Sequence, residues 1–315
     1  MSLIPAPDAP VAIVCGSDSL VGNALVSRLG EAQWRIVTID SPGADEHHAA
    51  ESSFLGPLED PATWQALREH LRLDGLSPRA FIHAVSGFAG PDSPRGADQK
   101  KAAATFCGLV DGAALGCEHI MPLMAEGDAG VVLLASMLAG WDTRAGANGY
   151  SASQGGLLAL ARSLALSGGP DGIRVNAVAA GLVAEDHDGQ AVPAVAGRIP
   201  LGQVASPDDI VDAIMFLLSA GARHVTGTTL VVDGGQSLQS WSNALREGHY
   251  PQLLASADPQ PQPPPTSRLP GPSETAERAL LPSARSEGRR VGDEGSAPGM
   301  RASHPYATAA TSLRS

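Results

Sequence analysis

The stretch VAIVCGSDSLVG, residues 11–22, carries the pattern that decides the fold of this chain. Its first five residues are all apolar, which is typical of a short strand buried on both faces. Gly16 and Gly22 then bound a turn that leads into a segment with helical periodicity, residues 20–29. Glycines let a backbone come close to a ligand, and a helix N-terminus offers amide N–H groups to an anion. We therefore predict a strand, a turn and a helix that together form a candidate dinucleotide site.

The same alternation continues to residue 239. Apolar runs rich in β-branched residues predict further strands at residues 35–39, 80–84, 131–135, 173–178 and 228–232. Segments with helical periodicity lie between them, at residues 61–71, 98–124, 150–166 and 207–218. Two of these helices have start signals, Asp60-Pro61 and Ser206-Pro207, which place proline at the first helical position. Strands and helices that alternate at this spacing predict an α/β fold, a single doubly wound parallel-sheet (Rossmann) domain.

Composition limits the class of protein. Charged residues make up 17% of the 315 residues and the formal net charge is −12, which disfavours a nucleic-acid partner. The three cysteines form no CxxC pair, so neither a disulfide framework nor a zinc site is expected. No apolar run approaches the roughly 18 residues of a membrane span, and the first ten residues lack the pattern of a signal peptide. We expect a cytoplasmic protein with no membrane partner.

The chain divides into an N-terminal extension (1–10), the Rossmann-type domain (11–239) and a tail (240–315). The tail holds 11 of the 25 prolines, and its large apolar residues are isolated from one another. Proline interrupts helices and sheets, and scattered apolar residues cannot offset the entropy lost on ordering. The tail is therefore predicted to be disordered, the alternative being a segment that docks a partner.

Several motifs occur in the order found in the short-chain dehydrogenase/reductase family, which the chain resembles over residues 9–236. They are YSASQ (150–154), GIRVNAV (172–178), PLG (200–202) followed by PDDI (207–210), and VTGTTLVVDGG (225–235). The resemblance implies a Rossmann fold and NAD(P)-linked oxidation or reduction of an alcohol or carbonyl. It also implies subunits that pair through the helices at residues 98–124 and 150–166.

The resemblance assigns a cofactor to the glycine turn and to the ends of neighbouring strands. Leu20 replaces the middle glycine of the family's TGxxxGxG turn, so its side chain is expected to crowd a pyrophosphate. Asp40 stands 18 residues after Gly22, where a carboxylate favours NAD(H) over NADP(H), unless it is an ordinary strand-end aspartate. Pro57 and Glu185 replace an adenine-contacting aspartate and a nicotinamide-holding threonine, so binding is expected to be weak or absent. The predicted contacts are Gly16, Ser17, Ser19, Leu20, Val21, Gly22, Asp40, His83, Ala84 and Gly181.

Only one of the family's four catalytic positions is unchanged. Tyr150 matches the tyrosine that transfers the alcohol proton, whereas the lysine, serine and asparagine positions hold Gln154, Met137 and Leu109. Because the lysine's charge lowers the pKa of the tyrosine, Tyr150 is expected to be a poor base near neutral pH. Ser136, one residue before Met137, is a candidate to supply the missing hydroxyl.

His187 is a further candidate acid–base residue. It lies beside Glu185, Asp186 and Asp188 in the predicted substrate loop, residues 182–199. The cluster is either a cation or acid–base site or a solvated turn, and because consecutive loop residues rarely converge on one metal, we expect none.

Three functions remain open. In the first, the chain is an atypical NAD(P)-linked oxidoreductase for a small or aromatic carbonyl or alcohol, with Tyr150 as its acid–base residue. Alternatively, it is a catalytically lapsed subunit that partners an active paralogue, or a non-redox lyase or cyclase that reuses the apolar pocket around Met137 and Leu109. The expected partners are a small-molecule substrate and other subunits, in a homo-oligomer or in a hetero-oligomer with a paralogue.

Overall fold

The computed structural model describes residues 5–44, 47, 49–85, 103, 105–124, 129–142, 147–184, 196 and 199–238. The predicted disordered tail, residues 240–315, lies outside these ranges, and the N-terminal extension is described from residue 5. Within the described ranges, no helix combines the length and the apolar character that crossing a membrane requires.

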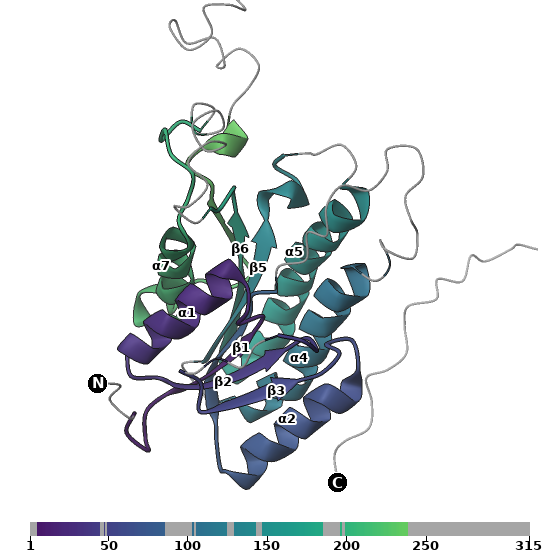
Figure 1. The fold of residues 1–315 in the computed structure, drawn as a ribbon, viewed down its shortest axis with the longest axis vertical. Coiled ribbons are helices and arrows are strands. Elements are labelled where there is room, and N and C mark those ends of the chain that lie inside the picture. Colours follow the sequence, from purple (N-terminus) through teal and green to yellow (C-terminus); the bar gives the residue numbers. More distant parts are fainter. Residues whose placement is uncertain are drawn as a thin grey trace, which may run out of the picture. The chain divides into compact units, whose positions relative to one another are not determined.

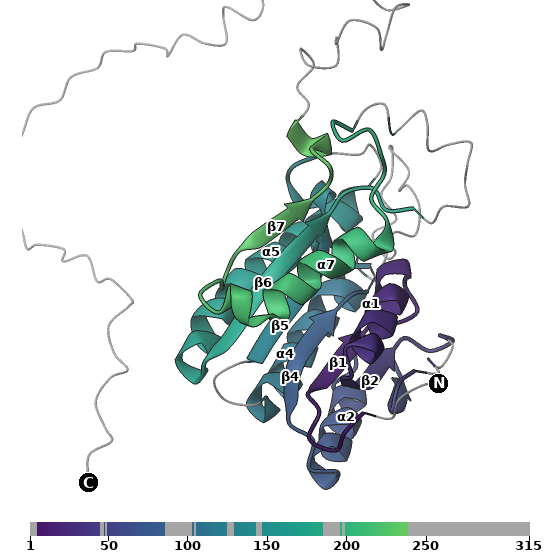
Figure 2. The same cartoon turned by 90° about the vertical axis from the view of Figure 1, so that its left-hand side faces the viewer.

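Seven parallel strands form one sheet in the order β3-β2-β1-β4-β5-β6-β7 (Figures 1 and 2). The strands are β1 (Val11–Cys15), β2 (Arg35–Asp40), β3 (Ser52–Leu55), β4 (Pro78–His83), β5 (Ala129–Ser136), β6 (Ile173–Ala180) and β7 (Thr229–Val232). The strand order runs one way from β1 to β3 and the other way from β4 to β7, which confirms the predicted doubly wound sheet. Such sheets bind ligands at the carboxyl ends of the strands where the order reverses, here between β1 and β4.

Helices cover both faces of the sheet (Figures 1 and 2). Helices α1 (Leu20–Glu31) and α7 (Pro207–Leu218) lie on one face, and α2 (Pro61–Leu73), α4 (Gly112–Ile120) and α5 (Asn148–Gly168) lie on the other. The first face packs a hydrophobic cluster that includes Leu25, Ile82 and Ile214. The second packs a cluster around Trp64 and Phe81, whose rings meet edge to face with centroids 5.9 Å apart. The two clusters fix the orientation of the strands and so of their carboxyl ends.

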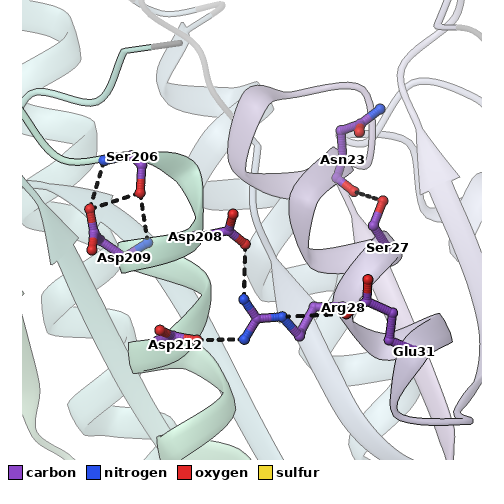
Figure 3. A network of polar contacts seen from close by, with 8 residues as sticks. All are labelled: Asn23, Ser27, Arg28, Glu31, Ser206, Asp208, Asp209 and Asp212. Carbon is purple, nitrogen blue, oxygen red and sulfur yellow. Dashed lines mark hydrogen bonds and ion pairs between the residues drawn. The ribbon is translucent and has the colours of Figure 1, made fainter. Parts of the chain in front are cut away.

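Helices α1 and α7 are also joined at the surface by one arginine (Figure 3). The Arg28 guanidinium of α1 donates to the carboxylates of Asp208, at 3.0 Å, and Asp212, both on α7. A capping box between Ser206 and Asp209 holds the first turn of α7. The carboxylates of Asp208 and Asp212 face Arg28 (Figure 3). The contact places two positions far apart in the sequence side by side on one face of the sheet.

The structure differs from the predicted elements in two places. The helix predicted over residues 98–124 contains a π-helical turn, Cys107–Asp111, before α4, and a short 3-10 turn, Met121–Leu123, after it; residues 98–102 and 104 lie outside the described ranges. Strand β3 was not predicted, because only its last two residues are apolar and none of its residues is fully buried. An edge strand with this pattern gives no periodic signal.

The small residues of α5 have neighbours within the chain. A Cβ added at Gly156 would lie 3.1 Å from Val110 Cγ2, and one at Gly155 would lie 3.4 Å from the Ala139 carbonyl oxygen. Gly156 therefore lets α5 approach the π-helical turn, whereas a Cβ at Gly155 would meet the Ala139 carbonyl at an ordinary contact distance.

Candidate functional site

A cleft opens at the carboxyl edge of the sheet, between the ends of β1, β4, β5 and β6. Its volume is about 340 Å³. Most of the lining is apolar, from Leu20, Val85, Leu134, Leu138, Leu182 and Val183, and the polar side chains are Ser19, Ser136, Tyr150 and Gln154. No charged side chain belongs to the described part of the lining. The described lining is therefore mostly apolar, with a few hydroxyl and amide groups among its side chains.

The glycine turn forms one wall of this cleft. Gly16 has a φ of +85°, and a Cβ there would lie 2.6 Å from the Val85 nitrogen. A Cβ at Gly22 would lie 2.0 Å from the Gly16 carbonyl oxygen. Ser19 caps α1 by accepting from the Gly22 N–H at 3.0 Å, and its hydroxyl donates towards the carbonyls of Gly16 and Ala84. Both glycines are thus required by the packing of the turn itself.

Asp40 holds the turn from the neighbouring strand. Its carboxylate accepts from the Ser17 backbone N–H at 2.6 Å and from the Ser17 hydroxyl at 2.7 Å, and only 1% of the residue is exposed. Burial raises the pKa of the Asp40 carboxyl, while the hydrogen bonds from Ser17 lower it. Both carboxylate oxygens therefore already have a partner within the protein, which gives Asp40 a structural part in addition to the predicted contact with a ribose.

The start of α1 fits the phosphates of a dinucleotide. Leu20 and Val21 are the first residues of the helix, and their backbone N–H groups have no hydrogen-bond acceptor among the described residues. Free amides at a helix N-terminus bind anions. The Leu20 side chain is 41% exposed and lines the same cleft, where the family usually has a glycine. The turn therefore fits NAD(P), and the Leu20 side chain narrows the approach to it.

Tyr150, Ser136 and Gln154 meet at the opposite wall. The Ser136 backbone N–H donates to Gln154 Oε1 at 2.8 Å, and the Ser136 hydroxyl oxygen accepts from the Leu138 N–H at 3.2 Å. Burial raises the pKa of the Tyr150 phenol, and a hydrogen bond with the Ser136 side chain lowers it in part. Gln154 is 2% exposed. The Gln154 side chain thus binds the Ser136 backbone, and none of the three side chains is charged.

The other predicted positions lie apart from this group. Met137 and Leu109 are buried and do not line the cleft. His83 is fully buried at the end of β4, and neither ring nitrogen has a hydrogen-bond partner among the described residues. Gly181 lines the cleft and packs against Asp233, because a Cβ there would lie 2.7 Å from the Asp233 Cα.

Two predictions fall on residues that the structure leaves undescribed. His187 and its acidic neighbours at 185, 186 and 188 lie outside the described ranges. Within those ranges, no group of three or more His, Cys, Asp or Glu side chains could hold a metal ion. The sequence reasoning did not identify the apolar lining from Val85, Leu134 and Leu138, although each lies close to the carboxyl end of a predicted strand.

Known proteins resemble this chain in sequence and in fold. Residues 22–237 match a family model described as enoyl-(acyl carrier protein) reductase. An uncharacterised short-chain type dehydrogenase/reductase of Sinorhizobium fredii is 34% identical over 71% of this chain, which spans only 43% of that protein's length. The cis-4-hydroxycyclohexanecarboxylate dehydrogenase of Sinomonas cyclohexanicum is 30% identical over 71% of this chain and 95% of its own. Ligand-free aldohexose dehydrogenase of Thermoplasma acidophilum has a TM-score of 0.65 at 20% identity, covering 74% of this chain and 95% of that one. The last likeness shows the fold alone.

Proposed function

The chain belongs to the short-chain dehydrogenase/reductase family, and from this premise we propose that it reduces a small or aromatic carbonyl compound with a nicotinamide cofactor and Tyr150 as proton donor. Members of the family bind NAD(P), act on small molecules and form oligomers. The observation that supports the proposal is the cleft whose described lining holds no charged side chain and extends from Leu20 and Val21, at the start of α1, to Tyr150.

The protonation state of Tyr150 favours reduction over oxidation. Oxidation of an alcohol needs a phenolate that accepts the alcohol proton, whereas reduction needs a neutral phenol that donates one. Because burial raises the pKa of Tyr150, the phenol is neutral near pH 7. In reduction the Tyr150 O–H bond breaks, its proton passes to the carbonyl oxygen, and the phenolate is reprotonated from water. A bound nicotinamide supplies the hydride to the carbonyl carbon.

The cleft and the turn also support a choice of substrate and cofactor. An uncharged carbonyl compound with an apolar or aromatic body matches the lining from Leu134, Leu138 and Leu182. NAD(H) is favoured over NADP(H), since the Asp40 carboxylate behind the turn repels a 2′-phosphate. The Leu20 side chain reduces affinity for either cofactor because it stands where the pyrophosphate approaches the backbone.

Cofactor titration followed by turnover tests this proposal. We expect the fluorescence of NADH to change when it binds the protein. The Leu20→Gly variant should bind NADH about tenfold more tightly, because the side chain that crowds the pyrophosphate is gone. With a panel of small and aromatic aldehydes and ketones, Tyr150→Phe should lower kcat by ~100-fold or more. The reduction rate should change little between about pH 6 and 9, since Tyr150 stays neutral there. Absence of binding by NADH and by NADPH at millimolar concentration, in the protein and in Leu20→Gly, would exclude the proposed function.

A catalytically lapsed subunit is the second candidate. It is favoured by Gln154, which stands at the lysine position. This side chain is buried and accepts a hydrogen bond from the Ser136 backbone N–H. If it is correct, the protein binds cofactor weakly, turns over none of the carbonyl panel, and forms a mixed oligomer when it is co-expressed with a paralogue of the same fold. A strict homo-oligomer under these conditions would argue against it.

A further inference from the structure

A hydrogen-bonded clamp between Ser17 and Asp40 joins the glycine turn to the end of β2. The Asp40 carboxylate accepts from the Ser17 backbone N–H at 2.6 Å and from the Ser17 hydroxyl at 2.7 Å, with one bond to each oxygen. Two oxygens that both accept are typical of an ionised carboxylate. Ser17 is fully buried and Asp40 is 1% exposed, and neither residue lines the cleft. The clamp therefore keeps Asp40 charged and covered by the protein.

The main chain also holds Asp40 in this position. Its carbonyl oxygen accepts from the Gly56 N–H at 3.0 Å, which ties the end of β2 to the end of β3. The carbonyl oxygen of the preceding residue, Ile39, accepts from the Gly16 N–H at 3.2 Å. Because the backbone at Asp40 is fixed, its carboxylate can reach a ligand only by leaving the two donors of Ser17. A contact with a ribose hydroxyl would thus break both hydrogen bonds of the clamp.

The negative charge of Asp40 has no cation beside it in the described structure. Both donors from Ser17 are neutral groups, and no ion pair among the described residues includes Asp40. Water and salt screen a buried charge less than an exposed one. The field of Asp40 therefore reaches the carboxyl end of β2, where a dinucleotide bound at the start of α1 has its adenosine ribose.

We propose that Ser17 determines how the turn distinguishes NAD(H) from NADP(H), because it takes up both oxygens of Asp40 and leaves the carboxylate to act on the ribose through its charge alone. A 2′-phosphate is repelled, whereas the ribose hydroxyls of NAD(H) donate no hydrogen bond to Asp40. Discrimination thus comes from repulsion of the phosphorylated ribose and not from a contact with the free one. The inference rests on the proposed function, because it concerns the cofactor of the same site.

Two ligands without the nicotinamide, ADP-ribose and 2′-phospho-ADP-ribose, isolate this end of the site, and calorimetry on the full-length protein measures their dissociation constants. Asp40→Asn keeps the size of the side chain and an acceptor for the Ser17 N–H, but it removes the charge. It should leave the affinity for ADP-ribose within about twofold and raise that for 2′-phospho-ADP-ribose about tenfold. A direct contact with the ribose predicts instead that Asp40→Asn binds ADP-ribose about tenfold more weakly, and this result overturns the proposal.

Ser17→Ala tests the part that we assign to the serine. The change frees one oxygen of Asp40, while the backbone N–H still holds the other. The freed oxygen should accept from the ribose, so ADP-ribose should bind roughly threefold more tightly and 2′-phospho-ADP-ribose should not. Unchanged constants in Ser17→Ala overturn the assignment. Asp171→Asn is the matched control, because it removes the same charge from an exposed residue just before β6, at the opposite edge of the sheet, and it should change neither constant.

The melting temperature of the ligand-free protein tests the clamp without a cofactor. Ser17→Ala should lower it by about 4 °C, because a hydrogen bond to a buried carboxylate is lost. The double variant Ser17→Ala/Asp40→Ala should melt no lower than Asp40→Ala, since the hydroxyl then has no carboxylate to bind. Additive losses overturn the clamp. Should Asp40→Ala fail to fold, the dissociation constants in Asp40→Asn and Ser17→Ala still decide.

The two measurements separate failure of this inference from failure of the proposed function. If neither ADP-ribose nor its 2′-phosphate binds at millimolar concentration, the proposed function fails and so does this use of the clamp, even where the melting temperatures of the variants are coupled. If both ligands bind and the melting temperatures are additive, the clamp fails while the proposed function stands.

Discussion

At the scale of single residues, His83 is the side chain with the least compensated burial in the described structure. It is fully buried, and neither ring nitrogen has a partner among the described residues. Burial lowers the pKa of His83 from 6.5 to about 4. As the pH falls below 6.5, His83 takes up a proton in the unfolded chain but stays neutral in the folded chain until the pH approaches about 4. The stability of the fold should therefore decrease between about pH 6.5 and pH 4, by about 3 kcal/mol at the lower limit.

Urea unfolding at a series of pH values checks this dependence. His83→Leu should raise the free energy of unfolding at pH 7 by about 1 kcal/mol, because no polar ring is left buried without a partner. Its urea midpoint should be higher accordingly. The same variant should also lose much of the decline between pH 6.5 and pH 4. His224→Gln is the control, since His224 is exposed near the end of α7. A His83→Leu protein with the same acid sensitivity as the wild type would contradict the assignment.

At the scale of elements, one cation adds a polar contact to the apolar packing of α1 and α7 in the described structure. Arg28 lies between Asp208 and Asp212 of α7 and also approaches Glu31 of its own helix, at 3.9 Å (Figure 3). Arg28→Gln would leave these three carboxylates facing one another without a counter-charge. We expect the melting temperature to fall by about 2 °C at low salt, because exposed ion pairs contribute little. The loss should shrink in ~1 M salt, where repulsion between carboxylates is screened.

Thermal unfolding in low and high salt measures this effect. Arg72→Gln is the matched control, because Arg72 makes one exposed contact, with Glu69 on its own helix α2. It should melt within about 1 °C of the wild type at both salt concentrations. A salt-independent loss in Arg28→Gln would mean that the aliphatic part of the side chain, and not its charge, joins the two helices.

The elements also show which parts of the structure are readable from the sequence. Strands such as β1 and β6 were predicted because a buried parallel strand is a nearly continuous apolar run, and α7 was predicted to the residue because its capping sequence is explicit. Strand β3 was missed because its pairing with β2 depends on backbone hydrogen bonds and not on an apolar pattern. The bond between Ser136 and Gln154 was missed for a related reason: a backbone N–H leaves no trace in the residue types.

At the scale of the whole molecule, all the hydrophobic packing that the structure describes is complete by residue 232. Both core clusters draw their members from residues 11–232, on the two faces of one sheet. We therefore predict that a chain ending at Gln239 melts within about 2 °C of the full-length protein and has the same urea m-value, because unfolding exposes the same surface. The control is a chain ending at Gly227, which lacks β7 and leaves the edge of β6 unpaired along Ala177–Ala180; it should not fold. If the chain ending at Gln239 instead shows a lower m-value and a melting temperature reduced by several degrees, residues 240–315 contribute buried surface, and the boundary of the domain lies further along the chain than its composition indicates.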